Sequence, residues 1–157
     1  MQNLWRQIST LYAALLIGQV LFALAIIVLI YSREPVDTSE LPLQYPMLGL
    51  LIVGLCIMTA FYFNNLRQNQ AQSLQIDLGA KLLHYRTSIL MRSAIIESGN
   101  LFCLILVFLT QGISPLLFFA VGLVAFVYFR PTLDNMIQMY HLTAQEALEL
   151  RRQVEAV

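Results

Sequence analysis

A short strip of polar side chains lies at the start of, and inside, an apolar stretch of the chain at residues 93–110. Glu97 is within this stretch, and Ser93 and Asn100 share its side of a helix, because residues three and four positions apart are neighbours on a helix surface. An isolated carboxylate in hydrocarbon is costly, so such a residue needs a partner or a function. The strip is therefore a candidate site, either for a proton or small cation or for a structural contact between helices.

The position of each residue along its predicted helix indicates which side chains can contact this strip. Gln19 is near the middle of the first apolar stretch and is level with Asn100, so we predict that these two side chains pair. Glu97 is nearer the start of its own stretch, where we predict that it meets Arg130 or Tyr62. A carboxylate that faces Arg130 would be charged, whereas an unpaired one in hydrocarbon would be neutral near pH 7. The first case describes a structural clamp and the second a protonatable site.

Three arginines border the strip and are candidate interfacial charges: Arg86, Arg92 and Arg130. Arg92 is five positions before Glu97 and points to nearly the opposite side of the helix, so we interpret it as an anchor at the membrane interface. Arg86 shares the side of Glu97 but is about 16 Å away at the usual helical rise. Arg130 follows the last apolar stretch, where its side chain can reach the phosphate layer.

The elements that carry these residues are predicted from composition and hydropathy. Hydrophobic residues make up 59% of the chain and charged residues only 11%, with a mean hydropathy of +0.71, which is unlike a soluble domain. A helix needs about 20 apolar residues to cross about 30 Å of hydrocarbon. The predicted spans cover about residues 11–31, 47–63, 93–110 and 115–129. The predicted fold class is all-α: a polytopic membrane protein whose residues 1–131 form an up-down bundle of four transmembrane helices.

The basic residues fall mainly on one side of this topology. They precede the first span, lie between the second and third, and follow the fourth: Arg6, Arg67, Lys81, Arg86, Arg92, Arg130, Arg151 and Arg152. The positive-inside rule then places both termini and the segment 64–92 in the cytoplasm, for a multi-pass protein of a bacterial inner membrane. The apolar spans make a lipid bilayer the predicted partner. Nine basic residues balance nine acidic ones, so the net charge argues against a nucleic-acid partner.

The cytoplasmic parts are predicted to be helical. An apolar face precedes the third span at helical spacing, formed by Leu74, Leu78, Leu82, Tyr85 and Ile89. This pattern predicts an amphipathic extension of the third helix that runs on into the span. The extension either lies on the membrane surface or continues straight into the cytoplasm and packs against the tail. In the cytoplasmic tail, residues 132–157, Thr143 and Glu146 have the spacing of a capping box, which predicts a short polar C-terminal helix from Ala144.

The stretch Ala94–Leu104, with the sequence AIIESGNLFCL, resembles the ion-carrying helix of the c subunit of rotary ATPases. In that family a membrane carboxylate, followed by a small or hydroxyl residue and an apolar run, binds a proton or a sodium ion. The resemblance implies that Glu97 is the carrier and that Ser98 and Gln19 are accessory ligands.

Over nearly its full length, the chain resembles a group of uncharacterised small four-helix bacterial membrane proteins. The shared pattern is Tyr-Arg-Thr, then Arg-x-Ala-x-x-Glu, then Arg-Pro-Thr. It is carried here by Tyr85-Arg86-Thr87, by Arg92, Ala94 and Glu97, and by Arg130-Pro131-Thr132. The resemblance implies the same topology and the same polar residues, and it implies no activity.

Motifs of enzymes are absent from the sequence. There is no HExxH, P-loop, GxSxG or pair of carboxylates, and Cys56 and Cys103 do not have the spacing of metal ligands. We therefore expect no catalysis, cofactor or metal. The predicted function is a non-catalytic accessory or assembly subunit that binds a membrane protein or further copies of itself. The alternative is a small oligomeric transporter, coupled to protons or cations, with Glu97 as the carrier.

Overall fold

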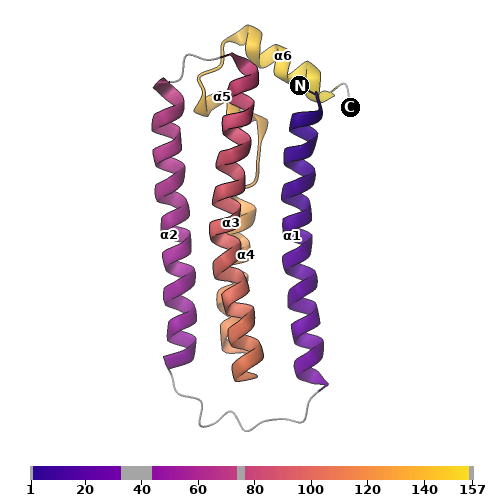
Figure 1. Ribbon diagram of the computed structural model, residues 1–157, viewed down its shortest axis with the longest axis vertical. Coiled ribbons are helices and arrows are strands. Elements are labelled where there is room, and N and C mark those ends of the chain that lie inside the picture. The colour runs from indigo at the N-terminus through magenta and orange to yellow at the C-terminus, as the bar shows by residue number, and fades with distance from the viewer. Residues whose placement is uncertain (1, 33–43, 74–76, 156–157) are drawn as a thin grey trace.

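The computed structural model describes residues 2–32, 44–73 and 77–155, and these residues form six helices and no strand (Figure 1). The four long helices are α1 (Gln2–Tyr31), α2 (Gln44–Ser73), α3 (Leu78–Thr110) and α4 (Ser114–Tyr128). Two short helices follow, α5 (Leu133–Met139) and α6 (Ala144–Glu155). The all-α prediction is confirmed for this part of the chain.

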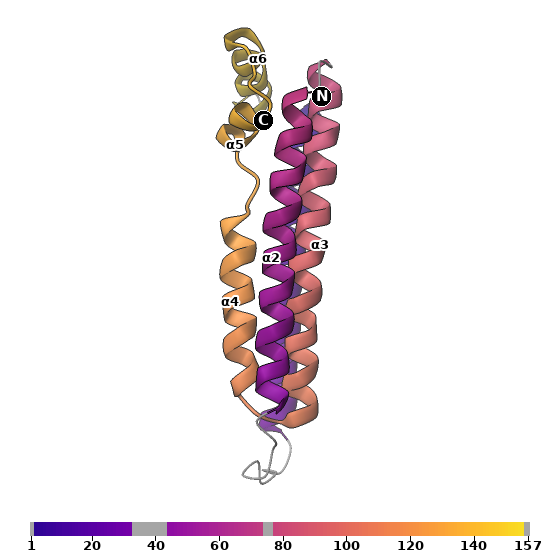
Figure 2. The same ribbon diagram turned by 90° about the vertical axis from the view of Figure 1, so that its left-hand side faces the viewer.

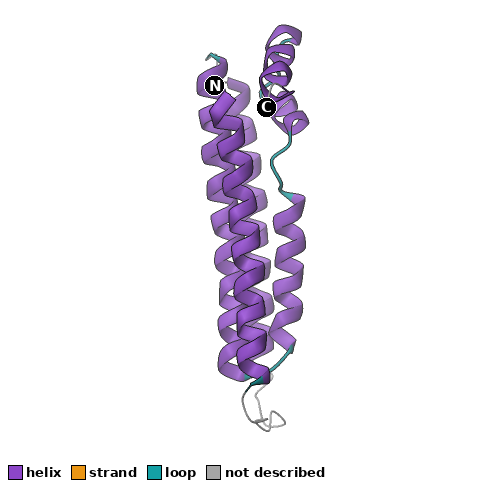
Figure 3. Cartoon of the chain, turned by 90° about the vertical axis from the view of Figure 1, so that its right-hand side faces the viewer, coloured by secondary structure: helices purple, strands orange, loops and turns teal. Residues whose placement is uncertain are grey.

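The long helices run side by side and alternate in direction (Figure 1). The helix α3 is central, because it contacts α1, α2 and α4. The helices α5 and α6 lie at the end of the bundle where both chain termini are found, which we call the terminal end (Figure 2). A short extended segment after α4 leads to them (Figure 3).

Three helices are long and apolar enough to cross a membrane, over Trp5–Tyr31, Met47–Ala71 and Leu78–Thr110. A fourth crossing is added if α4 and α5, which are bent by 67° relative to each other, count as one broken span. Large apolar side chains cover the outside of these helices, and Val28 and Met58 expose 65% and 71% of their surface. Such a surface suits lipid and would be unfavourable in water, so the helices indicate a multi-pass membrane protein.

The helix α3 is continuous from Leu78 to Thr110. Its 33 residues measure about 50 Å at 1.5 Å per residue, more than the roughly 30 Å of a hydrocarbon core. The excess fits the predicted extension at the terminal end. The predicted apolar face is buried at Leu78, Leu82, Tyr85 and Ile89, whereas Leu74 lies outside the described residues.

The tail packs against the terminal end of the bundle. The capping box is confirmed, since the Thr143 amide donates to Glu146 Oε2 at 2.8 Å and the Glu146 amide donates to Thr143 Oγ1 at 3.3 Å. The helix α6 is amphipathic rather than wholly polar, because Leu150 is buried in the same apolar cluster as Met136 of α5 and Ile8 of α1. The helix α5 was not predicted, and Thr132 caps it by accepting from the Asn135 amide.

Burial of Leu150 leads to a first prediction. Replacing Leu150, which is 1% exposed, with Ala should weaken docking of α6 by about 2–5 kcal/mol, because a large side chain is lost from a packed site. Limited proteolysis and amide hydrogen exchange of residues 144–155 in detergent would measure the release. Leu148→Ala is the matched control, since Leu148 lies on the same helix and is 57% exposed. Equal exchange in the two variants would contradict the packing.

Candidate functional site

The predicted pair of buried amides is confirmed. Asn100 Nδ2 donates to Gln19 Oε1 at 2.7 Å, which joins α3 to α1. Both side chains are almost completely buried, and Gln19 Nε2 and Asn100 Oδ1 have no partner among the described residues. Gly122 of α4 provides the room, since a Cβ atom there would lie 1.8 Å from Asn100 Oδ1. Three helices therefore meet around one amide pair, within apolar surroundings.

Glu97 is half-buried and makes no hydrogen bond or ion pair with any described residue. The predicted pairing with Arg130 or Tyr62 is not formed. Arg130 is exposed after α4, and it forms no ion pair with Glu97. Orientation excludes Tyr62, which is 70% exposed on α2, because the side of α3 that meets α2 carries Gly99, about 200° around the helix from Glu97.

The two serines near Glu97 differ in their surroundings. Ser93 is buried one turn before Glu97, on the same side of α3. Ser98 is exposed, and its hydroxyl donates to the Ile95 carbonyl of its own helix at 2.7 Å. Across the interface, its Oγ lies 3.9 Å from Cys56 Sγ of α2. The strip is therefore split: Asn100 points into the bundle, whereas Ser98 lies on the side toward α2.

Arg92 departs most from its predicted role. The prediction gave it no contact inside the bundle, whereas it is a buried residue, 9% exposed, that joins three elements. Its Nη1 donates to Asn64 Oδ1 of α2, and its Nη2 donates to the Phe129 carbonyl at the end of α4, at 2.9 Å. Its guanidinium also lies over the Phe129 ring, 4.6 Å from the centroid. The side opposite Glu97 is thus an inner side of α3, which faces α2 and the last turn of α4.

The other two predicted charges lie at the edges of the bundle. Arg86 is half-buried beside a shallow groove of α1 that includes Arg6, Thr10 and Ala14. Arg130 is exposed, immediately after α4. Neither is close enough to Glu97 to form an ion pair.

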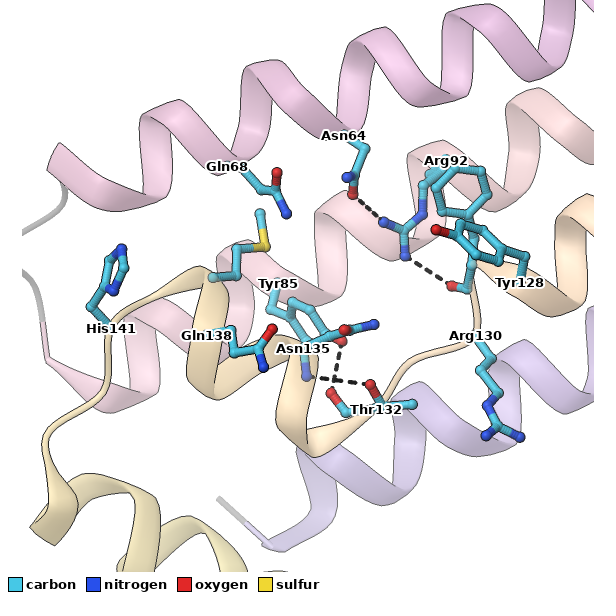
Figure 4. A pocket seen from close by; sticks show the side chains of 12 residues that line it. Asn64, Gln68, Tyr85, Arg92, Tyr128, Arg130, Thr132, Asn135, Gln138 and His141 are labelled. Atoms are coloured by element: carbon cyan, nitrogen blue, oxygen red, sulfur yellow. Dashed lines mark hydrogen bonds between the residues drawn. The ribbon is translucent and has the colours of Figure 1, made fainter.

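A polar cavity opens beside Arg92, and we call it the arginine pocket (Figure 4). It encloses about 530 Å³ between α2, α3, the end of α4 and α5. Its lining consists of Asn64, Gln68, Tyr85, Arg92, Tyr128, Phe129, Arg130, Thr132, Asn135, Gln138, Met139 and His141. This set contains two arginines and four side-chain amides, and it contains no carboxylate.

Sequence analysis did not find this pocket, because its lining comes from separate segments that only the fold brings together. Two local signals were available. Asn64 and Gln68 are four positions apart on α2, and Asn135 and Gln138 are three apart on α5, so each pair presents two amides on one helical face.

A second polar cluster fixes the tail to α3. Arg67 Nη1 lies 2.8 Å from His84 Nε2, and His84 Nδ1 meets the Tyr140 hydroxyl. Because arginine only donates, Nε2 accepts and His84 is neutral, with its proton on Nδ1. Lys81 Nζ donates to Glu146 Oε1 at 2.8 Å. No group of three or more potential metal-ligating side chains occurs within residues 2–32, 44–73 and 77–155.

The fold and its buried polar contacts define a helical multi-pass membrane protein. Comparison with known proteins adds no further assignment: the chain matches no model of a protein family, no curated protein and no solved structure.

The amide pair leads to a second prediction. Gly122→Ala should displace the Asn100 side chain, break its bond to Gln19 and destabilise the bundle by about 1–3 kcal/mol, as overpacking does. Thermal unfolding in detergent would measure the loss. Gly54→Ala is the matched control, because a Cβ atom at Gly54 has nothing within 4 Å. If the two variants melt together, Gly122 does not set the position of Asn100.

The contact between Lys81 and Glu146 leads to a third prediction. The hydrogen bond from Lys81, with that from the Thr143 amide, lowers the pKa of Glu146 from 4.5 to about 2. Because this pKa is lower in the folded chain than in an unfolded one, the contact stabilises fully above about pH 4.5 and is lost as the pH falls toward about 2.

Fluorescence of Trp5, the single tryptophan, should report that loss, since Trp5 packs on Tyr85 in the apolar cluster at the terminal end. We expect Glu146→Gln to remove most of the change between pH 5 and pH 2. Asp134→Asn, which alters a more exposed pair, should leave the transition in place. An unchanged transition in Glu146→Gln would show that another group is responsible.

Proposed function

We propose that this chain is a non-catalytic accessory or assembly subunit of a bacterial inner membrane. In this proposal α1 to α4 each cross the membrane, both termini are cytoplasmic, and the protein acts by binding another, unrelated membrane protein. The observation that carries the proposal is the half-buried carboxylate of Glu97, which has no partner within the described chain.

The position of Glu97 favours a contact between helices of different chains. An unpaired carboxylate at membrane depth is costly, and a polar side chain from a neighbouring helix would reduce that cost. The neighbouring polar side chains of the bundle make hydrogen bonds within it: Asn100 donates to Gln19, and Arg92, nearer the terminal end, donates to α2 and to the end of α4. On α3, Glu97 is therefore the acidic side chain that can contact an external partner.

The packing beyond the amide pair supports a non-conducting role. Below Gln19 and Asn100, the interior between α1, α3 and α4 is filled by Ala23, Cys103, Leu104 and Phe119, all of them buried and apolar or weakly polar. A path for ions along the axis of a single copy would need polar side chains or water at this level.

The alternative is a small oligomeric transporter that is coupled to protons or cations. The same unpaired Glu97 favours it, because a carrier residue must be able to bind and release its ion at the bundle surface. In this alternative, copies of the chain would meet around Glu97 and form the path between them.

Native mass spectrometry of the tagged protein, expressed at its natural level and extracted in mild detergent, would separate the two functions. We expect wild type to carry a stoichiometric, unrelated membrane protein, and Glu97→Leu to lose it. Glu97→Gln should retain most of the partner, since the amide keeps the shape and hydrogen bonding of a neutral acid. Arg152→Gln, in the exposed tail, is the control for general effects of substitution.

Recovery of a homo-oligomer alone would contradict the accessory role. Proton or cation flux in liposomes would then test the alternative. Flux that is lost in Glu97→Gln and kept in Glu97→Asp would establish Glu97 as the carrier.

A further inference from the structure

The arginine pocket contains a buried cation that lacks an anion. The two bonds of Arg92 go to neutral oxygens, those of the Asn64 side chain and the Phe129 backbone. The Nε–H group of Arg92 is buried and has no partner among the described residues. A buried charge without an opposite charge is unfavourable, and an unsatisfied donor adds to that cost. The site as built therefore favours an incoming anion.

The remaining lining has the chemistry of an anion site. Arg130 supplies a second positive charge, and no aspartate or glutamate lines the cavity. Asn64 uses its oxygen to accept from Arg92, which leaves its Nδ2 to donate. The side chains of Gln68 and Gln138, from α2 and α5, extend toward the same space (Figure 4). Several N–H donors around the Arg92 guanidinium match the many oxygen atoms of a phosphate. The exposed Arg130 side chain lies at the rim and is directed away from Arg92 (Figure 4), so it would contact the anion after a change of rotamer.

The depth of the pocket fits a phosphate at a membrane surface. From Arg92 to Thr110, the end of α3, the helix rises about 27 Å, close to the thickness of a hydrocarbon core. Arg92 therefore lies near the boundary between hydrocarbon and head groups. The helix α4 ends at Tyr128 beside it, and that end leaves the cavity of about 530 Å³ between α2 and α5.

We propose that the arginine pocket binds a phosphate-bearing anion, with Arg92 and Arg130 as its cationic contacts. The phosphate comes from the head group of an anionic phospholipid or from a small soluble phosphate compound. The site is separate from Glu97 and does not depend on the accessory function. Basic pockets between helices at the membrane surface are a known way of binding anionic head groups.

Thermal unfolding of the full chain in neutral detergent tests the proposal. The additives are short-chain phosphatidylglycerol, short-chain phosphatidylcholine, glycerol phosphate and inorganic phosphate, each against sodium chloride of equal ionic strength. We expect phosphatidylglycerol to raise the Tm and phosphatidylcholine to leave it unchanged. If glycerol phosphate or inorganic phosphate raises the Tm as much at equal concentration, the source is soluble; if only the lipid does, it is the membrane.

Variants of the pocket make the test specific. Arg130→Gln should raise the anion concentration needed for half of the maximal Tm shift about tenfold. This is the scale of one charge-assisted contact. Gln138→Leu, at an exposed position of the lining, should also weaken it. Both keep the bonds of Arg92, whereas Arg92→Gln removes contacts that join three elements and can unfold the protein.

Arg152→Gln is the matched control, because it removes one arginine from an exposed site outside the pocket. The proposal is overturned if no phosphate compound shifts the Tm of wild type beyond the salt control. It is also overturned if the shift is equal in Arg130→Gln and Arg152→Gln, since the anion would then bind elsewhere.

Discussion

The buried guanidinium of Arg92 is the constraint on which the terminal end of this protein depends. A cation at this depth requires acceptors, and it takes them from α2 and from the last carbonyl after α4. That bond requires α4 to end at the level of Arg92, so that a backbone carbonyl is free to accept. The chain then turns at Pro131, and Thr132 begins α5 across the end of the bundle. This contact acts together with the hydrogen bonds that Lys81, His84 and Tyr85 of α3 make to Glu146, Tyr140 and the Thr132 carbonyl, and the set positions the tail.

The amide pair has the corresponding role at the middle of the bundle. Gln19 and Asn100 hold α1 on α3, while α4 approaches through the space that Gly122 leaves. Close approach at a small residue and a hydrogen bond between polar side chains are the means by which helices associate where hydrocarbon surrounds them, because burial of apolar surface gives little there. The central helix α3 therefore carries both polar contacts, that of Arg92 toward the terminal end and that of Asn100 in the apolar interior.

Several features could be predicted from sequence. Hydropathy predicts the apolar helices, helical spacing predicts the apolar face of the extension and the capping box, and depth along the helices predicts the amide pair. The role of Arg92 could not be predicted. A helical projection gives the angle between Arg92 and Glu97, but which side faces the neighbours depends on where α2 and α4 pack. The helix α5 was missed because Pro131 signals only the end of α4. The arginine pocket needs four segments in their folded positions, which no local pattern contains.

Glu97 and Arg92 are on one helix, carry opposite charges and do not neutralise each other. They are separated by about 7 Å along α3 and about 140° around it, so the carboxylate faces away from the cavity in which the guanidinium lies. An ion pair between the two side chains would reduce the free-energy cost of burying both charges within one chain. In the proposed topology, this separation places the cation near the membrane surface and the acid at a greater depth. The two proposals complete these side chains by different chemistry, Arg92 by an anion and Glu97 by another helix.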